Sequence, residues 1–316
     1  MRGTKNGHFL STISYNLQTN MPQINKTVLM SGADFFSDAD AINDLMDSHI
    51  PISIDQAKQE HQSIIDAFIQ AGIKVVKIPP PEGCQDGIYT ANWALVRENR
   101  ALLSRLPNKR QPEEAFAKKI LKDQGLEVLE LPGSIRAFSG QGDALACGDL
   151  VFCQSPYRTS ADAHHYLKDL LGFKQVISLQ TKPAQWFKFG PAKTNKITGW
   201  PDSPTYDLDL ALAVIHPGSE NTKPLIAYCP AVFKKPSRQL LGDFNWADTI
   251  KVSRKETMNA FALNLVSTGQ TVIMNIGAPK FKAQLVSRGL KTIELSLNEL
   301  KKGGGSIRCS TLTLDG

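Results

Sequence analysis

The stretch IIDAFIQAGIKVVKI, residues 64–78, contains the pattern that decides the fold. Apolar residues at helical spacing precede Gly72, and a short β-branched run follows it. A glycine in this place suits a helix that ends on a residue in the left-handed conformation. The β-branched run after it is typical of a strand. The stretch therefore predicts a helix, a glycine at the helix end, and a strand.

The same pattern recurs along the chain. The further copies are AKKILKDQGLEVLEL (117–131, with Gly125), HHYLKDLLGFKQVISL (164–179, with Gly172), KAQLVSRGLKTIEL (282–295, with Gly289) and a more degenerate ADTIKVS (247–253). The period is roughly 45 to 75 residues, at or beyond the range that is typical of repeat architectures. The chain is therefore expected to consist of five copies of one unit.

Each copy is followed by a polar or glycine-rich loop and then by a second apolar strand. These segments are DGIYTANWALV (86–96), SGQGDALACGDLVF (139–152), TYDLDLALAVI (205–215), NAFALNLVSTGQTVIM (259–274) and GGGSIRCSTLTL (303–314). An open Rossmann sheet also alternates strands and helices. It requires a glycine fingerprint after the first strand, and KIPPPEGCQDG (77–87) does not supply one. Five units closed in a ring would bring the five polar loops to a central axis, with Cys309 among them.

Size and charge narrow the class of protein. The 316 residues can bury a sizeable core and suit one large domain or two ordinary ones. The formal charge is +6, but the basic residues are scattered along the chain. This argues against a nucleic-acid-binding arm and only weakly suits a small anionic ligand. We expect no nucleic-acid partner.

The N-terminal segment has the composition of a disordered extension. Residues 1–20 contain basic residues but no continuous apolar run after them, which argues against a secretory signal. No apolar stretch reaches the about 18 residues that a membrane helix needs. We therefore expect an extension over residues 1–20, a single domain over residues 21–316, no membrane partner and a cytoplasmic location.

The five cysteines are dispersed. They are odd in number and lack the close pairs of a zinc site, which fits reduced thiols. Four of them, Cys84, Cys147, Cys153 and Cys229, are expected to be small core residues. No spacing of His, Cys and Asp suggests a metal site, so we expect neither a metal nor an organic cofactor.

Several segments together carry a resemblance to a known family. They are VLMSGADFF (28–36), AINDLM (41–46), DGIYTANWALV, LLSRLPNKRQPEE (102–114), SGQGDAL, YRTSADAHHYL (157–167) and GGGSIRCSTLTL. In this order the chain resembles the guanidino-group-modifying superfamily, which includes dimethylarginine dimethylaminohydrolases, arginine deiminases and amidinotransferases. The resemblance runs from about Met21 to the end of the chain. It implies an α/β fold, a five-bladed α/β propeller also called the pentein fold.

The resemblance implies that Cys309 is a nucleophile. In such enzymes a cysteine thiolate attacks the guanidinium carbon of the substrate, and a histidine protonates the departing amine and then activates water. A buried structural cysteine is the alternative for Cys309. The glycines beside it favour the active thiol, because they permit close approach of a substrate and are poor core formers. The neighbouring Arg308 is given no role.

The resemblance also indicates residues that bind substrate. Asp86 matches the carboxylate that holds the guanidinium group, and a planar cation with several N–H donors suits such an acceptor. Asn92 stands where relatives have Asp or Asn. Arg158 and Arg110 match residues that hold the substrate carboxylate, and Asp143 matches a fixed part of its motif. The alternatives are a turn residue for Asp86, a strand-edge residue for Asn92 and solvated surface charges for the arginines.

Two positions depart from the family pattern. Ser139 stands where the family commonly has Glu, and Asp207 stands where it has His. Asp209 keeps the Asp of that motif, and the resemblance implies that it binds substrate. None of the six histidines is an obvious replacement for the missing general acid/base. Asp207 can assume the proton transfers only if burial or the nearby Asp209 raises a carboxyl pKa.

Two functions remain open on the sequence. The first is a hydrolase or amidinotransferase-like enzyme that forms a covalent thiouronium at Cys309, with Asp207 and Ser139 as altered acid/base residues. The second is a pseudoenzyme that binds an arginine-like cation without turnover. Both imply a small guanidino compound as partner, and either a monomer or a homodimer is compatible with the sequence.

Two expectations about the pocket follow from the enzyme hypothesis. Cys309 should lie at the bottom of a pocket within reach of Asp86, with the other four cysteines away from it. Asp207 and Ser139 should lie together on one wall that faces the Cys309 sulfur, because they replace two residues that act as a pair.

Overall fold

A computed structural model describes residues 22–47, 49–185 and 190–316 of the chain. The N-terminal extension that the sequence predicts over residues 1–20 lies outside the described residues.

The strands form five sheets of three strands each. The sheets are β15 (Leu312–Thr313), β1 (Thr27–Ser31) and β2 (Lys74–Ile78); β3 (Ala94–Arg97), β4 (Arg100–Leu103) and β5 (Glu127–Leu129); β6 (Ala144–Cys147), β7 (Leu150–Gln154) and β8 (Gln175–Leu179); β9 (Leu212–His216), β10 (Leu225–Tyr228) and β11 (Asp248–Lys251); and β12 (Val266–Ser267), β13 (Thr271–Asn275) and β14 (Lys291–Leu295). In every sheet the middle strand pairs antiparallel with one neighbour and parallel with the other. The predicted five-unit α/β propeller is confirmed.

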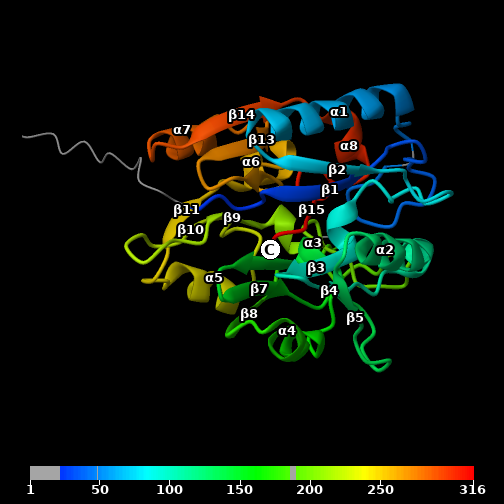
Figure 1. Ribbon diagram of the computed structural model, residues 1–316, viewed down its shortest axis with the longest axis horizontal. Coiled ribbons are helices and arrows are strands. Elements are labelled where there is room, and N and C mark those ends of the chain that lie inside the picture. The colour runs from blue at the N-terminus through cyan, green and yellow to red at the C-terminus, as the bar shows by residue number, and fades with distance from the viewer. Residues whose placement is uncertain (1–21, 48, 186–189) are drawn as a thin grey trace, which may run out of the picture.

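A helix connects the two parallel strands of each sheet. These helices are α1 (Ile54–Gln70), α2 (Pro112–Asp123), α4 (Ala163–Leu171), α5 (Lys235–Gly242) and α7 (Pro279–Val286). Figure 1 shows them toward the outside of the molecule, with the C-terminal end near its middle. Parallel strands need such a crossover connection, whereas four of the antiparallel pairs, β3–β4, β6–β7, β9–β10 and β12–β13, are consecutive in the chain and joined directly.

The glycines at the helix ends have the conformation that the sequence predicts. The φ angles are 80° at Gly72, 82° at Gly125, 70° at Gly172 and 81° at Gly289, all in the left-handed region. The degenerate copy lacks this feature, because α5 ends at Asp243 with a φ of −91°. The chain then passes through a longer loop before β11.

The two ends of the chain close the ring. β15 pairs antiparallel with β1, with Val28 opposite Thr313. The Asp315 carboxylate accepts hydrogen bonds from the backbone N–H groups of Lys26 (2.9 Å) and Thr27 (2.8 Å). The first sheet is therefore completed by the last strand, β15. Like β3, β6, β9 and β12 in the other four sheets, β15 pairs antiparallel with the middle strand of its sheet, and these five are called the inner strands.

The inner strand of each sheet follows a short polar turn. η1 (Thr90–Trp93), α3 (Gly140–Asp143) and η3 (Leu208–Leu210) precede β3, β6 and β9. Polar residues within a few positions of the five inner strands include Asn92, Asp143, Asp209, Asn264 and Cys309. Because the inner strands occupy equivalent places in the five units, residues far apart in sequence come together.

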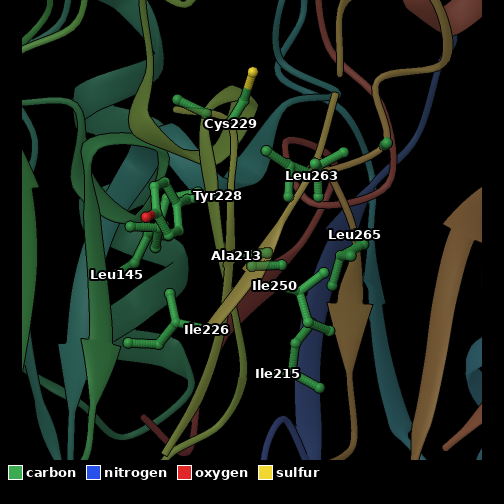
Figure 2. Packing of buried hydrophobic residues seen from close by; sticks show 14 of the residues in the cluster. Leu145, Ala213, Ile215, Ile226, Tyr228, Cys229, Ile250, Leu263 and Leu265 are labelled. Carbon is green, nitrogen blue, oxygen red and sulfur yellow. The ribbon is translucent and has the colours of Figure 1, made fainter. Parts of the chain in front are cut away.

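Apolar side chains fill the space between neighbouring units. One core cluster takes residues from the third, fourth and fifth sheets, and Figure 2 shows Leu145, Ala213, Ile226, Tyr228 and Leu263 of it. Each large side chain buried in this way stabilises the fold by about 1.5–3 kcal/mol. The remaining helices are η2 (Asn108–Arg110), α6 (Arg254–Ala260) and α8 (Asn298–Lys302). Of the helices in the described residues, none is long and apolar enough to cross a membrane.

Candidate active site

The glycines before Cys309 are required by packing. A Cβ atom on Gly305 would lie 2.5 Å from Tyr89 Cε1 and 2.9 Å from Cys309 Cβ. Gly304 has a φ of 88°, which side chains rarely tolerate. The GGGSIRC segment therefore presses its backbone against Tyr89, and this fixes Cys309 in the wall of a pocket.

The Cys309 sulfur forms hydrogen bonds with the side chains of Asp209 and Asn264. The thiol donates a hydrogen bond to Asp209 Oδ2 (3.2 Å), and Asn264 Nδ2 donates one to the sulfur (3.1 Å). Asn264 Oδ1 in turn accepts from the backbone N–H groups of Arg308 (3.0 Å) and Cys309 (3.2 Å). Asn264 thus holds both the thiol and its backbone.

Asn264 was not identified by sequence reasoning. Its signal was present, because NAFALNLVSTGQTVIM places an asparagine just before the fifth unit's inner strand, as DGIYTANWALV places Asn92 before the second unit's. Asn43 of AINDLM was also missed. It lines the pocket, and its Nδ2 donates to the Gly303 carbonyl (3.1 Å).

The structure brings Ser139 and Asp207 together. Ser139 Oγ donates to Asp207 Oδ1 (3.0 Å), and Asn92 Nδ2 donates to Asp207 Oδ2 (2.8 Å) and to Ser139 Oγ (2.9 Å). A Cβ on Gly142 would lie 2.8 Å from Asp207 Oδ2, so this glycine makes room for the carboxylate. Both residues line the same pocket as Cys309.

Arg110 is bound within the protein. Its guanidinium forms a two-point ion pair with Glu113 (2.7 and 2.8 Å) and donates to Asn92 Oδ1 (2.8 Å). It also donates to the backbone carbonyls of Asp86 (3.1 Å) and Tyr89 (3.2 Å). With so many acceptors already engaged, Arg110 lines the pocket chiefly as a fixed positive charge.

Arg158 has fewer partners. Its guanidinium donates to the Ile42 carbonyl and lies 5.1 Å from the Tyr206 ring centroid and 5.9 Å from that of Trp200. Its buried Nε has no hydrogen-bond partner in the part of the chain that the structure describes. Of Arg110 and Arg158, it is therefore Arg158 that has an N–H donor available for a ligand.

Asp86 and Asp143 are both buried. Asp86 accepts from Gln85 Nε2 (2.9 Å) and lines the pocket with Cys309. Asp143 lies deeper. Its Oδ1 accepts from the Leu208 backbone N–H (3.0 Å), which holds the turn that carries Asp207 and Asp209.

The pocket that contains Cys309 is small. Its volume is about 20 Å³, room for about one water. The lining includes Asn43, Asp86, Tyr89, Arg158, Asp207 and Cys309. Within residues 22–47, 49–185 and 190–316, no histidine and no other cysteine lines it, and no group of His, Cys, Asp or Glu in the same ranges is arranged to hold a metal.

Burial raises the pKa of four aspartates in this region, Asp86, Asp143, Asp207 and Asp209. It raises the pKa of Asp86 to about 6 against the opposing effect of Arg110. Burial and the neighbouring Asp207 raise the pKa of Asp209 to about 8. Burial, followed by Asp209 and Asp207, raises the pKa of the Cys309 thiol well above its usual range. The pocket therefore favours the protonated forms of these groups, and a bound cation would favour the ionised forms.

The raised pKa of Asp209 leads to a prediction about stability. Between the ordinary Asp value of 3.8 and about 8, the folded protein keeps a proton on Asp209 that the unfolded chain has lost. The contribution of Asp209 to the free energy of unfolding should therefore decrease as pH rises, by about 1.4 kcal/mol per pH unit. Asp209→Asn cannot lose a proton, so denaturant unfolding should show this variant gaining stability over the wild type across that range.

The matched control is Asp169→Asn, which removes a carboxylate from the exposed surface of α4. If the stability difference between wild type and Asp209→Asn is constant from about pH 5 to about pH 8, Asp209 does not titrate as described.

Comparison of the sequence with known proteins identifies related chains. No protein-family model matches the chain. The chain is 31% identical over 286 residues to the N(G),N(G)-dimethylarginine dimethylaminohydrolase of Mycobacterium tuberculosis, and these residues cover 90% of this chain and 84% of the relative. It is 29% identical over 293 residues to the bifunctional arginine dihydrolase/ornithine cyclodeaminase ArgZ of Synechocystis sp., covering 90% of this chain but 37% of that protein.

Solved structures agree in fold. The N-terminal domain of ArgZ bound to substrate has a TM-score of 0.78 and 27% identity, with 92% of this chain and 98% of that chain covered. A form of the same domain covalently bound to a reaction intermediate has the same TM-score and identity over 91% and 97% of the two chains. A dimethylarginine dimethylaminohydrolase adduct with 4-chloro-2-hydroxymethylpyridine has a TM-score of 0.66 and 19% identity over 92% and 99%, which shows the fold alone.

Proposed function

The chain belongs to the guanidino-group-modifying superfamily of dimethylarginine dimethylaminohydrolases and arginine dihydrolases, and from this premise we propose that it is an amidine hydrolase acting on an arginine-like compound through Cys309. One observation carries the proposal. The Cys309 thiol shares a buried pocket with Asp86 and Asp207 and is hydrogen-bonded to Asp209.

The pocket suits a guanidinium group by charge and by geometry. Asp86 and Asp207 line it, Asp209 adjoins the sulfur, and all three are buried. A planar cation with several N–H donors can donate to such carboxylates in pairs. Its charge would also lower the pKa of these acids and of the thiol, because an opposite charge favours the ionised forms. Substrate binding thus prepares the nucleophile.

The anionic end of an arginine-like compound needs a positive partner. Arg158 lines the pocket, and its buried Nε has no acceptor among the described residues. Arg110 is occupied by Glu113 and contributes charge from a distance. Because the pocket holds only about 20 Å³, the segment at Ile42, to which Arg158 donates, must move when a ligand enters.

Two carboxylates divide the proton transfers in this proposal. The charge of the bound cation favours the ionised form of Asp209, which then accepts the Cys309 proton, since its Oδ2 lies 3.2 Å from the sulfur. The sulfur then bonds to the guanidinium carbon, one C–N bond breaks, and the leaving amine takes a proton from Asp207. In the second half, Asp207 removes a proton from water and the resulting hydroxide bonds to the carbon. The C–S bond then breaks, Asp209 returns its proton to the sulfur, and the hydroxyl proton left on the product passes to solvent as the C=O bond forms. Burial raises the pKa of Asp207, which makes its protonated form accessible.

A second candidate function is binding without turnover. It is favoured by the absence of a histidine from the described pocket lining. It is also favoured by the hydrogen bonds from Asn92 and Ser139, which tie Asp207 to its own wall. A protein of this kind would use the carboxylates and Arg158 only to hold an arginine-like cation.

Incubation with a panel of guanidino compounds separates the two functions. Arginine, its methylated forms and decarboxylated analogues would be supplied, and mass spectrometry would follow loss of an amine and gain of oxygen. We expect an oxygen-containing product from at least one compound, and weaker binding by about 10- to 100-fold in Asp86→Asn because a charge-assisted pair is lost. Glu82→Gln, on the exposed part of the same loop, is the control. Binding by the wild type without any product would establish the second function instead.

A further inference from the structure

A second cavity lies next to Asp209. Its volume is about 220 Å³, and it shares no lining residue with the pocket that contains Cys309. Apolar residues of the inner strands and the turns before them make up most of the wall, including Leu95, Val96, Leu145, Leu212, Leu263 and Leu265. Figure 2 shows Leu145, Leu263 and Leu265 among the packed side chains of this region. The contact between Asp209 and Cys309 therefore separates two different cavities.

Arg308 provides the apolar cavity with a cationic side chain. The Asp315 carboxylate also lines the cavity, and it accepts hydrogen bonds from the backbone N–H groups of Lys26 and Thr27. Arg308 Nη1 donates to Thr313 Oγ1 and Arg308 Nη2 to Gln141 Oε1, both at 3.0 Å. Over the described ranges, Arg308 forms no ion pair with a carboxylate. A guanidinium has further N–H donors beyond these two bonds. Arg308 is thus a cation that lines a cavity with donors still available.

Asp209 supplies a second polar group to the same cavity. Its Oδ2 faces the Cys309 thiol, whereas its Oδ1 is buried without a hydrogen-bond partner among the residues that the structure describes. Asp209 lines the cavity together with Arg308. An unpaired buried oxygen is costly, so a ligand that pairs with it would be stabilised here.

We propose that this cavity binds a small apolar monocarboxylic acid, whose carboxyl group pairs with Arg308 and with Oδ1 of Asp209 and whose apolar body packs against the leucines. The size agrees, because a cavity of about 150 Å³ suffices for benzene. A benzoate-sized acid is therefore the expected class of ligand. This site goes beyond the proposed function and does not require turnover at Cys309.

Protonation of Asp209 makes the binding depend on pH. Asp207, Asp143, Cys309 and Arg308 are the titratable or charged groups that act on it. Burial and Asp207 raise the pKa of Asp209 to about 8. Above that pH the ionised Asp209 would repel the ligand carboxylate, so affinity should fall as pH rises through about 8.

Fluorine NMR of 4-fluorobenzoate tests the site. We expect binding to the wild type and to Cys309→Ala, and a loss of affinity of about 10- to 100-fold in Arg308→Met. Because Arg308 also bridges Gln141 and Thr313, Arg308→Met could lose affinity by failing to fold. A second variant, which keeps Arg308, separates loss of the site from loss of folding. Ala146 lines the cavity and is not fully buried, and Ala146→Leu should fill the space and weaken binding by at least about tenfold.

Arg158→Met serves as the control for binding in the other pocket. The proposal predicts that this variant keeps its affinity. If Ala146→Leu binds 4-fluorobenzoate like the wild type while Arg158→Met does not, the ligand occupies the pocket of Cys309 and the proposal is wrong. It is equally wrong if the wild type does not bind. Turnover of guanidino compounds is irrelevant to either result, so failure of the hydrolase proposal is recognised separately.

Discussion

Cys309→Ala is expected to abolish the conversion of every guanidino compound that the wild-type protein turns over. Loss of an enzyme's covalent nucleophile can lower kcat by about 10⁶-fold. The physical reason is that neither Asp209 nor Asn264, the two side chains hydrogen-bonded to the sulfur, can form the bond to the guanidinium carbon. The measurement is the rate of amine release under saturating substrate.

The matched control is Cys84→Ala. Cys84 is also buried and lies two residues before Asp86, but it does not line the pocket. Its variant should keep most of the activity, while Cys309→Ala should still bind the substrate. Equal rates in Cys309→Ala and the wild type would exclude thiol catalysis at this site.

The double variant Ser139→Glu with Asp207→His is expected to raise hydrolysis of an arginine-like compound. The gain should be at most about 10²–10⁴-fold, the full contribution of a general acid/base, because Asp207 already transfers protons in the proposed mechanism. The contact between Ser139 Oγ and Asp207 Oδ1 (3.0 Å) shows that the two positions adjoin. A glutamate at the first position is thus placed to orient an imidazole at the second. The measurement is kcat/KM for the best compound of the panel.

Each single variant should gain little. Asp207→His alone lacks the carboxylate that orients the ring, and Ser139→Glu alone adds an acid beside Asp207 in a buried site. Thermal unfolding would first show that the double variant is folded. A folded double variant with no gain in hydrolysis, and no faster alkylation of Cys309 near neutral pH, would mean that the pocket serves a different chemistry.

The sequence was sufficient to predict the five units. The helix, glycine and strand pattern is local, because a glycine in the left-handed conformation ends a helix whatever packs around it, as at Gly72 and Gly289. The fourth unit was hard to recognise for the same reason. Its helix ends at Asp243 without such a glycine, so the local signal is weak although the sheet is complete.

The different hydrogen-bond partners of Asp207 and Asp209 could not be predicted from the sequence. The two residues are separated by one leucine, and only the backbone decides where each side chain points. Asp207 is extended, with φ −106° and ψ 150°, whereas Asp209 lies inside the turn η3. Asp207 consequently meets Ser139 and Asn92, and Asp209 meets Cys309.

Two further features could not be predicted because they depend on packing. They are the ion pair of Arg110 with Glu113 and the second cavity. Glu113 follows Arg110 by three residues, and that spacing suits a local ion pair. The resemblance to substrate-binding arginines gave no sign of it. The cavity beside Arg308 is lined by side chains of several inner strands. These strands are far apart in the sequence, so no single segment predicts the cavity.

Mass spectrometry of the acid-quenched protein tests the central claim most directly. Because the described pocket has no histidine to activate water, the thiouronium should be hydrolysed slowly and accumulate. The account predicts that the peptide containing Cys309 gains the mass of the guanidino compound less its leaving amine, and that Cys309→Ala shows no such gain. A compound that binds and is turned over without any adduct at Cys309, or with an adduct at another cysteine, would contradict it.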